Sequence, residues 1–146
     1  MNDKDKELLF IDLCGRIPYK VRMFEIEPIN DIQSNLTLLS ITNKESVICI
    51  TPSGGVIGSS IDAFKPYLFP LSSMTEEQRE EFLNIQTEER QILLNALIEY
   101  KSGKYDKIPI IAPYKQIEWL NKNHFDYRGL IEKSLALDAT NLGIYE

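Results

Sequence analysis

The stretch that decides the fold is NLTLLSITNKESVICITPSGGVIGSSI, residues 35–61. It contains three short runs rich in β-branched and aliphatic residues, which are typical of β-strands. The runs span residues 35–42, 46–51 and 55–61. Turn-forming residues separate them at 43–45 and 52–54. Because parallel neighbours need a long crossover and these connections have only three residues, we expect antiparallel pairing.

Upstream of this stretch, the sequence predicts a short helix and one further strand. Asp3 or Asp5 can cap the helix, and Gly15 stands where a helix would end. From Tyr19 the pattern changes to alternation, and turn formers at 28–34 separate this strand from the next. We therefore expect a β-rich region over 19–61, with about four antiparallel strands, either open or curled towards a small barrel.

Downstream, residues 64–71 differ in character because they combine Pro66 and Pro70 with large apolar side chains. Proline removes a backbone donor and so disfavours a central strand. We expect an extended strap or a single 3₁₀ turn at one edge of the sheet. Thr75 and Gln78 then form a capping box, which predicts a helix start.

A helical half is expected over residues 75–138, packed on the sheet. The apolar pattern is interrupted at 86–90, so residues 75–102 form either one kinked helix or two abutting helices. A connector with an apolar plug follows at 104–113, and then a helix at 114–123. Asp126 can cap a last helix. The whole chain, residues 1–146, is expected to form a single α+β domain.

Charge and composition limit the classes of partner. The 146 residues carry 16 Lys and Arg against 22 Asp and Glu, a formal net charge of −6. An acidic chain lacks the basic face that duplex DNA binding needs. Aromatic and cationic residues at Tyr19, Lys20 and Arg22 leave a patch for single-stranded nucleic acid as an alternative.

The cysteines and the hydropathy pattern bear on location. Cys14 and Cys49 form no C-x-x-C pair. The first residues lack the apolar run of a secretion signal, and no run approaches the about 20 residues that span a bilayer. We expect a cytoplasmic protein without a membrane segment, in which the cysteines are small buried hydrophobes.

Side chains suited to molecular recognition are densest at residues 119–131, WLNKNHFDYRGLI, which hold the only tryptophan and the only histidine of the sequence. As core residues, the aromatics would pack the joint between two helices. As surface residues, Trp119, His124, Tyr127 and Arg128 form a candidate interaction surface, because tryptophan, tyrosine and arginine are enriched in interface hot spots. The sequence alone leaves both interpretations open.

The sequence contains little that indicates a catalytic site or a metal site. His124 and Asp126 are two residues apart, as an orienting pair requires, but both also fit helix-end roles. No histidine and cysteine spacing matches a zinc site, so no metal and no cofactor are expected. A small hydrolase would need His124 to meet Cys14 or Cys49. We assign no catalytic residue and favour a protein that is not an enzyme.

Three blocks of the sequence resemble corresponding blocks in a known group of proteins. They are Glu7-Leu8-Leu9 with residues 12–19 (DLCGRIPY), residues 65–77 (KPYLFPLSSMTEE), and Trp119-Leu120-Asn121 with residues 124–133 (HFDYRGLIEK). In these blocks the chain resembles a group of small uncharacterised proteins from gut Bacteroidales genomes and their prophages and mobile elements. That group has no assigned activity, so the resemblance implies no functional residues. It implies a cytoplasmic accessory protein with a link to phage.

The sequence thus leads to one favoured function and two alternatives. The favoured function is a non-enzymatic protein-interaction module whose protein partner and oligomeric state the sequence leaves open. The first alternative is a single-stranded nucleic-acid-binding protein. The second is a small Cys/His hydrolase.

Overall fold

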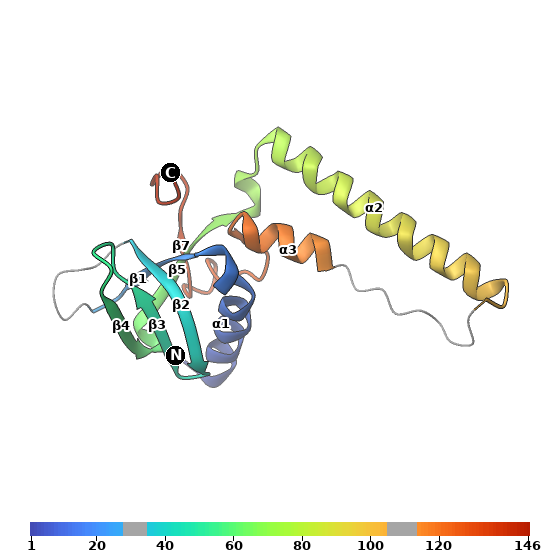
Figure 1. Cartoon of the computed structure of the whole chain (residues 1–146). Helices are drawn as coiled ribbons and strands as arrows, with labels where there is room; N and C mark the ends of the chain where they lie inside the picture. The colour runs from blue at the N-terminus through green and yellow to red at the C-terminus, as the bar shows by residue number, and fades with distance from the viewer. Residues whose placement is uncertain (28–34, 105–113) are drawn as a thin grey trace. The chain divides into compact units, whose positions relative to one another are not determined.

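The computed structural model describes residues 1–27, 35–104 and 114–146, and these form an α+β fold (Figure 1). The predicted fold class is confirmed. The chain divides into two compact units. We call Met1–Ser73 with Asn121–Glu146 the sheet unit, and Met74–Leu120 the helical unit. Each is described by itself, and the single domain expected from the sequence stays a prediction.

The described residues form three helices and seven strands. The helices are α1 (Asp3–Arg16), α2 (Glu76–Lys101) and α3 (Tyr114–Lys122). The strands are β1 (Arg22–Glu25), β2 (Leu36–Asn43), β3 (Ser46–Ile50), β4 (Val56–Ser60), β5 (Phe64–Pro70), β6 (Phe125–Asp126) and β7 (Leu137–Asp138). Short 3₁₀ turns cover Ile17–Tyr19, Ile61–Ala63 and Leu71–Ser73.

The predicted meander is confirmed. β1 to β4 pair as antiparallel neighbours in chain order. Within the described part of the chain, the sheet runs β4-β3-β2-β1-β5-β6, and β7 pairs with β5. The sheet is open and does not close into a barrel. The predicted turn region at 28–34 lies outside the described residues.

The expected edge strap is instead an internal strand, β5, and this prediction was wrong. β5 pairs antiparallel with β1 over Phe64 to Pro66, and then in parallel with β7 and β6. Pro66 is the last β5 residue of the β1 ladder, and Pro70 is the last of the β6 ladder. Because the partner changes along β5, each proline stands where one ladder stops, so its missing N–H interrupts neither ladder internally.

α1 contributes Leu9 and Leu13, one helical turn apart, to the apolar core that the strands build. Its start is capped by Asn2, whose side chain accepts a hydrogen bond from the Asp5 N–H, so neither predicted aspartate is the cap. Gly15 does not end the helix, which continues to Arg16. A Cβ at Gly15 would stand 2.8 Å from the Asn121 amide nitrogen, so this glycine permits a close approach.

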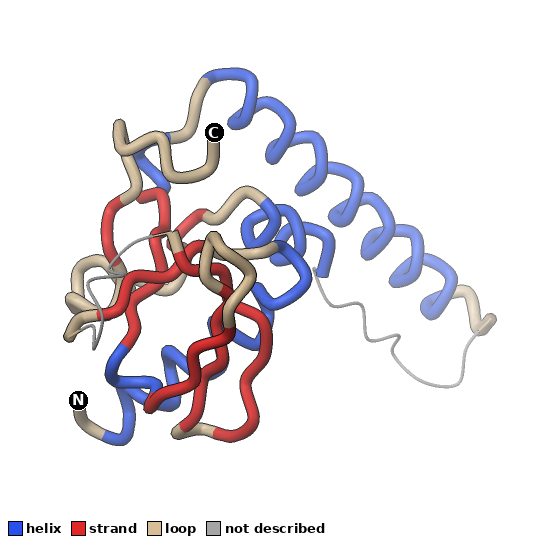
Figure 2. Tube along the Cα trace, turned by 60° about the vertical axis from the view of Figure 1, so that its left-hand side comes forward, coloured by secondary structure: helices blue, strands red, loops and turns tan. Residues whose placement is uncertain are grey.

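The helical unit begins as predicted. The Gln78 N–H donates to the Thr75 hydroxyl and the Thr75 N–H donates to the Gln78 side chain, which completes the capping box. α2 is a single helix of 26 residues, and Figure 2 shows it running without a break. The predicted helix at 114–123 corresponds to α3. The predicted connector falls mainly on 105–113, outside the described residues.

The last predicted helix does not form, and residues 127–136 make turns between β6 and β7. Asp126 nevertheless caps backbone amides as expected, because its carboxylate accepts from Arg128, Leu130 and Ile131 N–H groups at 3.3, 2.9 and 2.8 Å. Gly129 has a φ of +71°, which breaks helical continuation directly after the cap.

Candidate interaction surfaces

Trp119, the first residue of the aromatic block, lies on α3 in the helical unit and is only 6% exposed. Its ring packs on Phe82 of α2, with 5.3 Å between the ring centroids. Offset aromatic pairs of this kind stabilise beyond the area they bury. Trp119 therefore helps to hold α3 on α2.

Polar contacts between α2 and α3 continue from that pair. The Glu89 carboxylate accepts from the Lys115 backbone N–H at 2.8 Å and from the Gln116 amide at 2.6 Å. The Gln86 amide donates to Gln116 at 3.2 Å. Glu89 is buried and satisfies one of the unpaired amides of the first turn of α3. The two helices run antiparallel, because contacts later in α2 meet residues earlier in α3.

From Asn121 onwards the block lies in the sheet unit, around a buried ion pair. The Asp12 carboxylate accepts from the Arg16 Nε at 2.6 Å and from the Arg16 Nη2 at 3.0 Å. The Arg16 Nη2 also donates to the Phe125 carbonyl at 2.8 Å. Arg128 lies 3.5 Å from the same Asp12 carboxylate. This cluster fastens β6 and the following turn to α1.

Tyr127 lies near two guanidinium groups of that cluster. The guanidinium carbons of Arg16 and Arg128 lie 5.6 and 5.0 Å from its ring centroid, within cation–π range. The Tyr127 hydroxyl donates to the Asn121 side chain at 3.1 Å. Tyr127 and Arg128 are half-buried. These contacts give Tyr127 and Arg128 a structural role in the sheet unit.

His124 follows α3 in a left-handed conformation, with a φ of +60°. Its ring stacks on Tyr145, with centroids 3.9 Å apart and planes 13° apart. Burial, and then the positive charges of Arg16 and Arg22, lower the pKa of His124 to about 4. The imidazole is therefore neutral near pH 7. Asp126 gives it no orienting partner, because three backbone amides engage that carboxylate.

The cysteines lack the chemistry of an activated nucleophile. Cys49 is buried as predicted, but Cys14 is exposed, so the prediction of a buried residue was wrong for Cys14. Partial burial raises the pKa of the Cys14 thiol, and burial with the Glu25 charge raises the pKa of Cys49 to about 12. A nucleophilic cysteine needs the opposite shift, because the thiolate is the reactive form. In the described ranges, moreover, no three side chains of the His, Cys, Asp and Glu types gather in a way that could hold a metal ion.

Lys20 and Arg22, from the predicted nucleic-acid patch, line one pocket of about 500 Å³. Its other walls come from Ile17, Pro18 and residues of β2 and β3. The Arg22 guanidinium donates to the Thr37 hydroxyl at 2.7 Å, which fixes its position. Lys20 is exposed and Tyr19 is half-buried. The structure thus brings both cations of the patch to the edge of one hollow.

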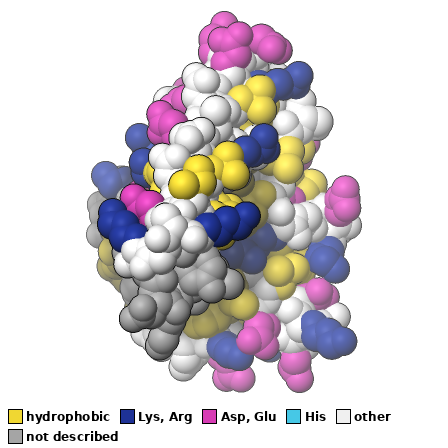
Figure 3. All heavy atoms as spheres, turned by 90° about the vertical axis from the view of Figure 1, so that its right-hand side faces the viewer, with side chains coloured by type: hydrophobic (Ala, Val, Ile, Leu, Met, Phe, Trp, Pro, Cys, Tyr) yellow, Lys and Arg dark blue, Asp and Glu magenta, His cyan; other side chains and the backbone are white. Residues whose placement is uncertain are grey.

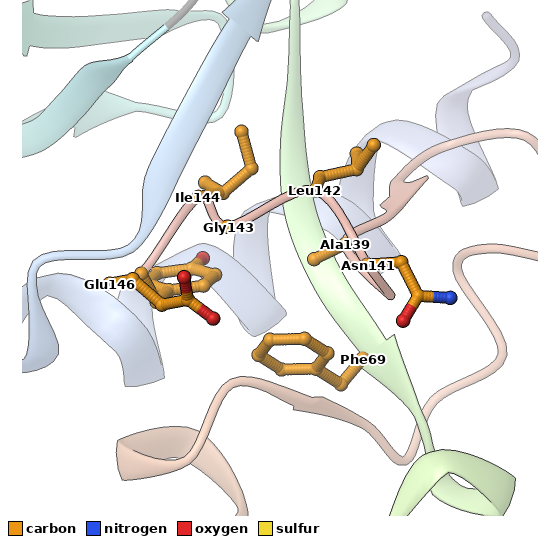
Figure 4. Close-up of a pocket in the computed structure, with 8 residues that line it drawn as sticks. Phe69, Ala139, Asn141, Leu142, Gly143, Ile144 and Glu146 are labelled. Carbon is orange, nitrogen blue, oxygen red and sulfur yellow. The ribbon is translucent and has the colours of Figure 1, made fainter.

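A second pocket of the sheet unit, about 580 Å³, lies beside Phe69 of β5 and is lined by residues 139 and 141–146. Figure 4 shows this C-terminal segment crossing β5 near the Phe69 ring. Tyr145 holds the segment in place: its hydroxyl donates to the Tyr67 carbonyl and accepts from the Arg22 N–H. Apart from Asn141 and Glu146, the side chains around this pocket are apolar or aromatic.

Exposed large apolar side chains are densest in the helical unit, which is the shorter of the two. Of fourteen exposed large hydrophobic side chains among the described residues, seven lie in this unit, which contributes only two of the nineteen buried ones. Five are on α2: Leu83, Ile92, Leu93, Leu94 and Ile98. Figure 3 shows hydrophobic side chains at the surface along α2, with acidic side chains gathered towards its start.

Three of these residues form a line, which we call the α2 stripe: Leu83, Leu94 and Ile98. At about 100° per residue, they fall within roughly 60° of one another around the helix axis. Of the residues that contact α3, Phe82 and Glu89 lie about 100° or more from the stripe, and Gln86 about 60° or more. The stripe is therefore distinct from the surface that α3 covers.

The four residues predicted as one interaction surface fall in both units: Trp119 in the helical unit, and His124, Tyr127 and Arg128 in the sheet unit. That surface stays a prediction. Sequence reasoning missed the α2 stripe, because Leu83 merged with the core-facing pattern of the same helix. The signal in the sequence was the spacing of its members: Leu94 follows Leu83 by eleven residues and Ile98 follows Leu94 by four, and both spacings bring a residue back to the same face of a helix.

In the described part of the chain, no helix combines the length and the apolar composition that a bilayer crossing requires. Comparison of the chain with protein-family models, curated proteins and solved structures finds no match.

Proposed function

We propose that this protein is a non-enzymatic protein-interaction module that binds its partner through α2. The observation that carries the proposal is the imbalance in the helical unit, where seven large apolar side chains are exposed and two are buried. A packed unit normally buries most of its large apolar residues, and contiguous exposed apolar surface marks interaction sites. A partner on α2 would remove this surface from water.

The tryptophan, tyrosine and arginine of residues 119–131 support this assignment, because each of them makes contacts within its own unit. Trp119 packs on Phe82, and Tyr127 and Arg128 belong to the cluster around Asp12. These residues stabilise the two units, which leaves α2 as the richest apolar surface. A cytoplasmic location fits two free cysteines, and an accessory role in a phage or mobile element is part of the proposal.

Photo-crosslinking in the source cells tests the proposal. A photoreactive phenylalanine analogue replaces Ile98 on α2 or, as a matched control, Val56 on β4; both side chains are 65% exposed. We expect a discrete crosslinked species from position 98 and background from position 56. Equal background at both positions would overturn the proposal.

A second candidate function is single-stranded nucleic-acid binding at Lys20 and Arg22, which the shared pocket favours. The two cations would contact phosphate, and the Tyr19 ring could stack on a base. The net charge of −6 opposes this use, since phosphate contacts dominate such affinities.

Fluorescence anisotropy with a labelled oligonucleotide tests this second candidate. Binding that weakens with salt and is reduced at least tenfold by Lys20→Ala with Arg22→Ala would support it. Lys133→Ala is a matched control, because Lys133 is exposed elsewhere in the sheet unit. Absence of binding at low salt would remove this candidate.

A further inference from the structure

We infer that the partner of α2 is a second copy of this chain, paired antiparallel across a two-fold axis that passes between Arg90 and Gln91. This inference rests on the proposed function and specifies the partner. The apolar and charged residues along the exposed face of α2 support this pairing.

Exposed residues of that face are placed symmetrically, with one pair of large apolar side chains and one pair of a threonine and a leucine. Leu83 and Ile98, at the two ends of the α2 stripe, are equally distant from the Arg90–Gln91 midpoint, and so are Thr87 and Leu94. Reversing the direction of the helix about this midpoint therefore places Leu83 opposite Ile98 and Thr87 opposite Leu94. All four side chains are exposed. Isologous dimers need such a self-complementary surface, which meets its own copy.

The charged residues of the face are placed with opposite signs. Glu80 precedes the stripe and Lys101 follows it, at equal distances from the same midpoint. Both are exposed, and neither forms a salt bridge with another described residue. Antiparallel pairing brings Glu80 of one copy to Lys101 of the other, twice in the dimer. A parallel pair would instead bring like charges together.

The spacing also suits helix–helix packing. The face continues through Glu80, Leu83, Thr87, Arg90 and Leu94 in alternating steps of three and four residues. This is the heptad pattern by which two helices pack side by side. Only Leu83 and Leu94 of these five are apolar, and Arg90 is the charged residue nearest the axis, where it lies close to its own copy. It limits the affinity of the pair.

The opposite side of α2 lacks this symmetry. Ile92 is exposed there, about 160° round the helix from Leu94, and its neighbours on that side include Glu81 and Glu88. One exposed apolar residue among acidic ones, with the half-buried Ile85 two turns before it, does not make a self-complementary surface. Ile92 and Glu81 therefore provide matched control positions on the same helix.

Sedimentation equilibrium of the purified full chain tests the inference. We expect a concentration-dependent dimer that Leu94→Lys weakens at least about tenfold, while Ile92→Lys, at a site of similar exposure, changes the dissociation constant less than about threefold. Far-UV circular dichroism confirms that both variants keep their helices. A monomer at all concentrations up to about 0.5 mM, or equal effects of the two variants, would overturn the inference.

Charge reversal tests the antiparallel direction. Glu80→Lys and Lys101→Glu each place like charges together at both ends of the dimer, so each should weaken it about tenfold. The double variant should return to within about threefold of the wild type, and Glu81→Lys should have little effect. Failure of the double variant to recover would overturn antiparallel pairing.

The crosslinking experiment at position 98 separates this inference from the proposed function. A crosslinked species composed of two copies of this chain supports both. A species that contains a different protein keeps the proposed function and overturns the self-pairing. No species above background overturns both.

Discussion

The carboxylate of Asp12 and the guanidinium of Arg16, one helical turn apart on α1, form an ion pair in which both side chains have no solvent exposure. Two hydrogen bonds join them at 2.6 and 3.0 Å. The pair ties α1 to β6, because Arg16 also donates to the Phe125 carbonyl. A charge at this depth is tolerated only while its partner is present.

Removing one partner should therefore be costly. We expect Asp12→Ala to lower the free energy of unfolding by about 3–5 kcal/mol, because it leaves Arg16 buried without its main counter-ion. The double change Asp12→Leu with Arg16→Met should cost less than the two single changes together. Urea unfolding followed by circular dichroism measures both. The exposed pair Lys44 and Glu7 is the control, and Glu7→Ala should cost under about 1 kcal/mol.

His124 should make stability depend on pH. Its pKa is lowered to about 4 in the folded protein, against about 6.5 in an unfolded chain, so the unfolded state binds the extra proton first. The contribution to stability is complete above about pH 6.5 and is lost as the pH falls towards 4. His124→Asn keeps a residue that tolerates the left-handed backbone and removes the titration.

Urea unfolding at pH 7 and pH 5 measures the effect. We expect the wild type to lose more stability than His124→Asn over this interval, after both are compared in the same buffers. An identical loss in the two proteins would show that protonation of His124 is not linked to unfolding.

Gly15→Ala should destabilise the sheet unit, although alanine is the better helix former. The new Cβ would stand 2.8 Å from the Asn121 amide nitrogen, and Asn121 is buried and accepts from the Tyr127 hydroxyl. We expect a net loss of about 1–2 kcal/mol. In an Asn121→Ala background the same change should instead stabilise, by up to about 1 kcal/mol. Thermal unfolding of the four proteins measures this reversal of sign.

Glu89→Ala should loosen α3 from α2. It removes a buried carboxylate that accepts two hydrogen bonds from the first turn of α3, each worth about 1.5–3 kcal/mol when one partner is charged. Trp119 is the only tryptophan and lies in the helical unit, so its fluorescence reports the change. Glu88→Ala, exposed on the neighbouring position, should leave the emission unchanged.

The features that the sequence predicted well are local. The meander follows from runs and turns between residues 35 and 61, and the Thr75–Gln78 capping box needs only four residues. β5 could not be predicted in this way, because Pro66 and Pro70 are acceptable only where pairing passes from β1 to β7 and β6. Those partners are remote in sequence.

The candidate site shows the same division. Asp126 was predicted to cap a helix: its carboxylate does accept backbone amides, but no helix follows it, and Gly129 has a positive φ. The role of Tyr127 depends on Arg16, more than a hundred residues earlier, and no local pattern reveals that contact. The α2 stripe was visible as a spacing, but only the packing of α3 showed which face of α2 stays exposed.

The position of β5 also has a consequence for biosynthesis. β5 pairs with Phe125 and Leu137, so its second half has no strand partner until about 55–70 further residues have been synthesised. An open strand edge invites pairing with other chains. The ladders from β5 to β6 and β7 can therefore form only after the C-terminal segment has been synthesised, and until then residues 67–70 of the nascent protein offer an open strand edge.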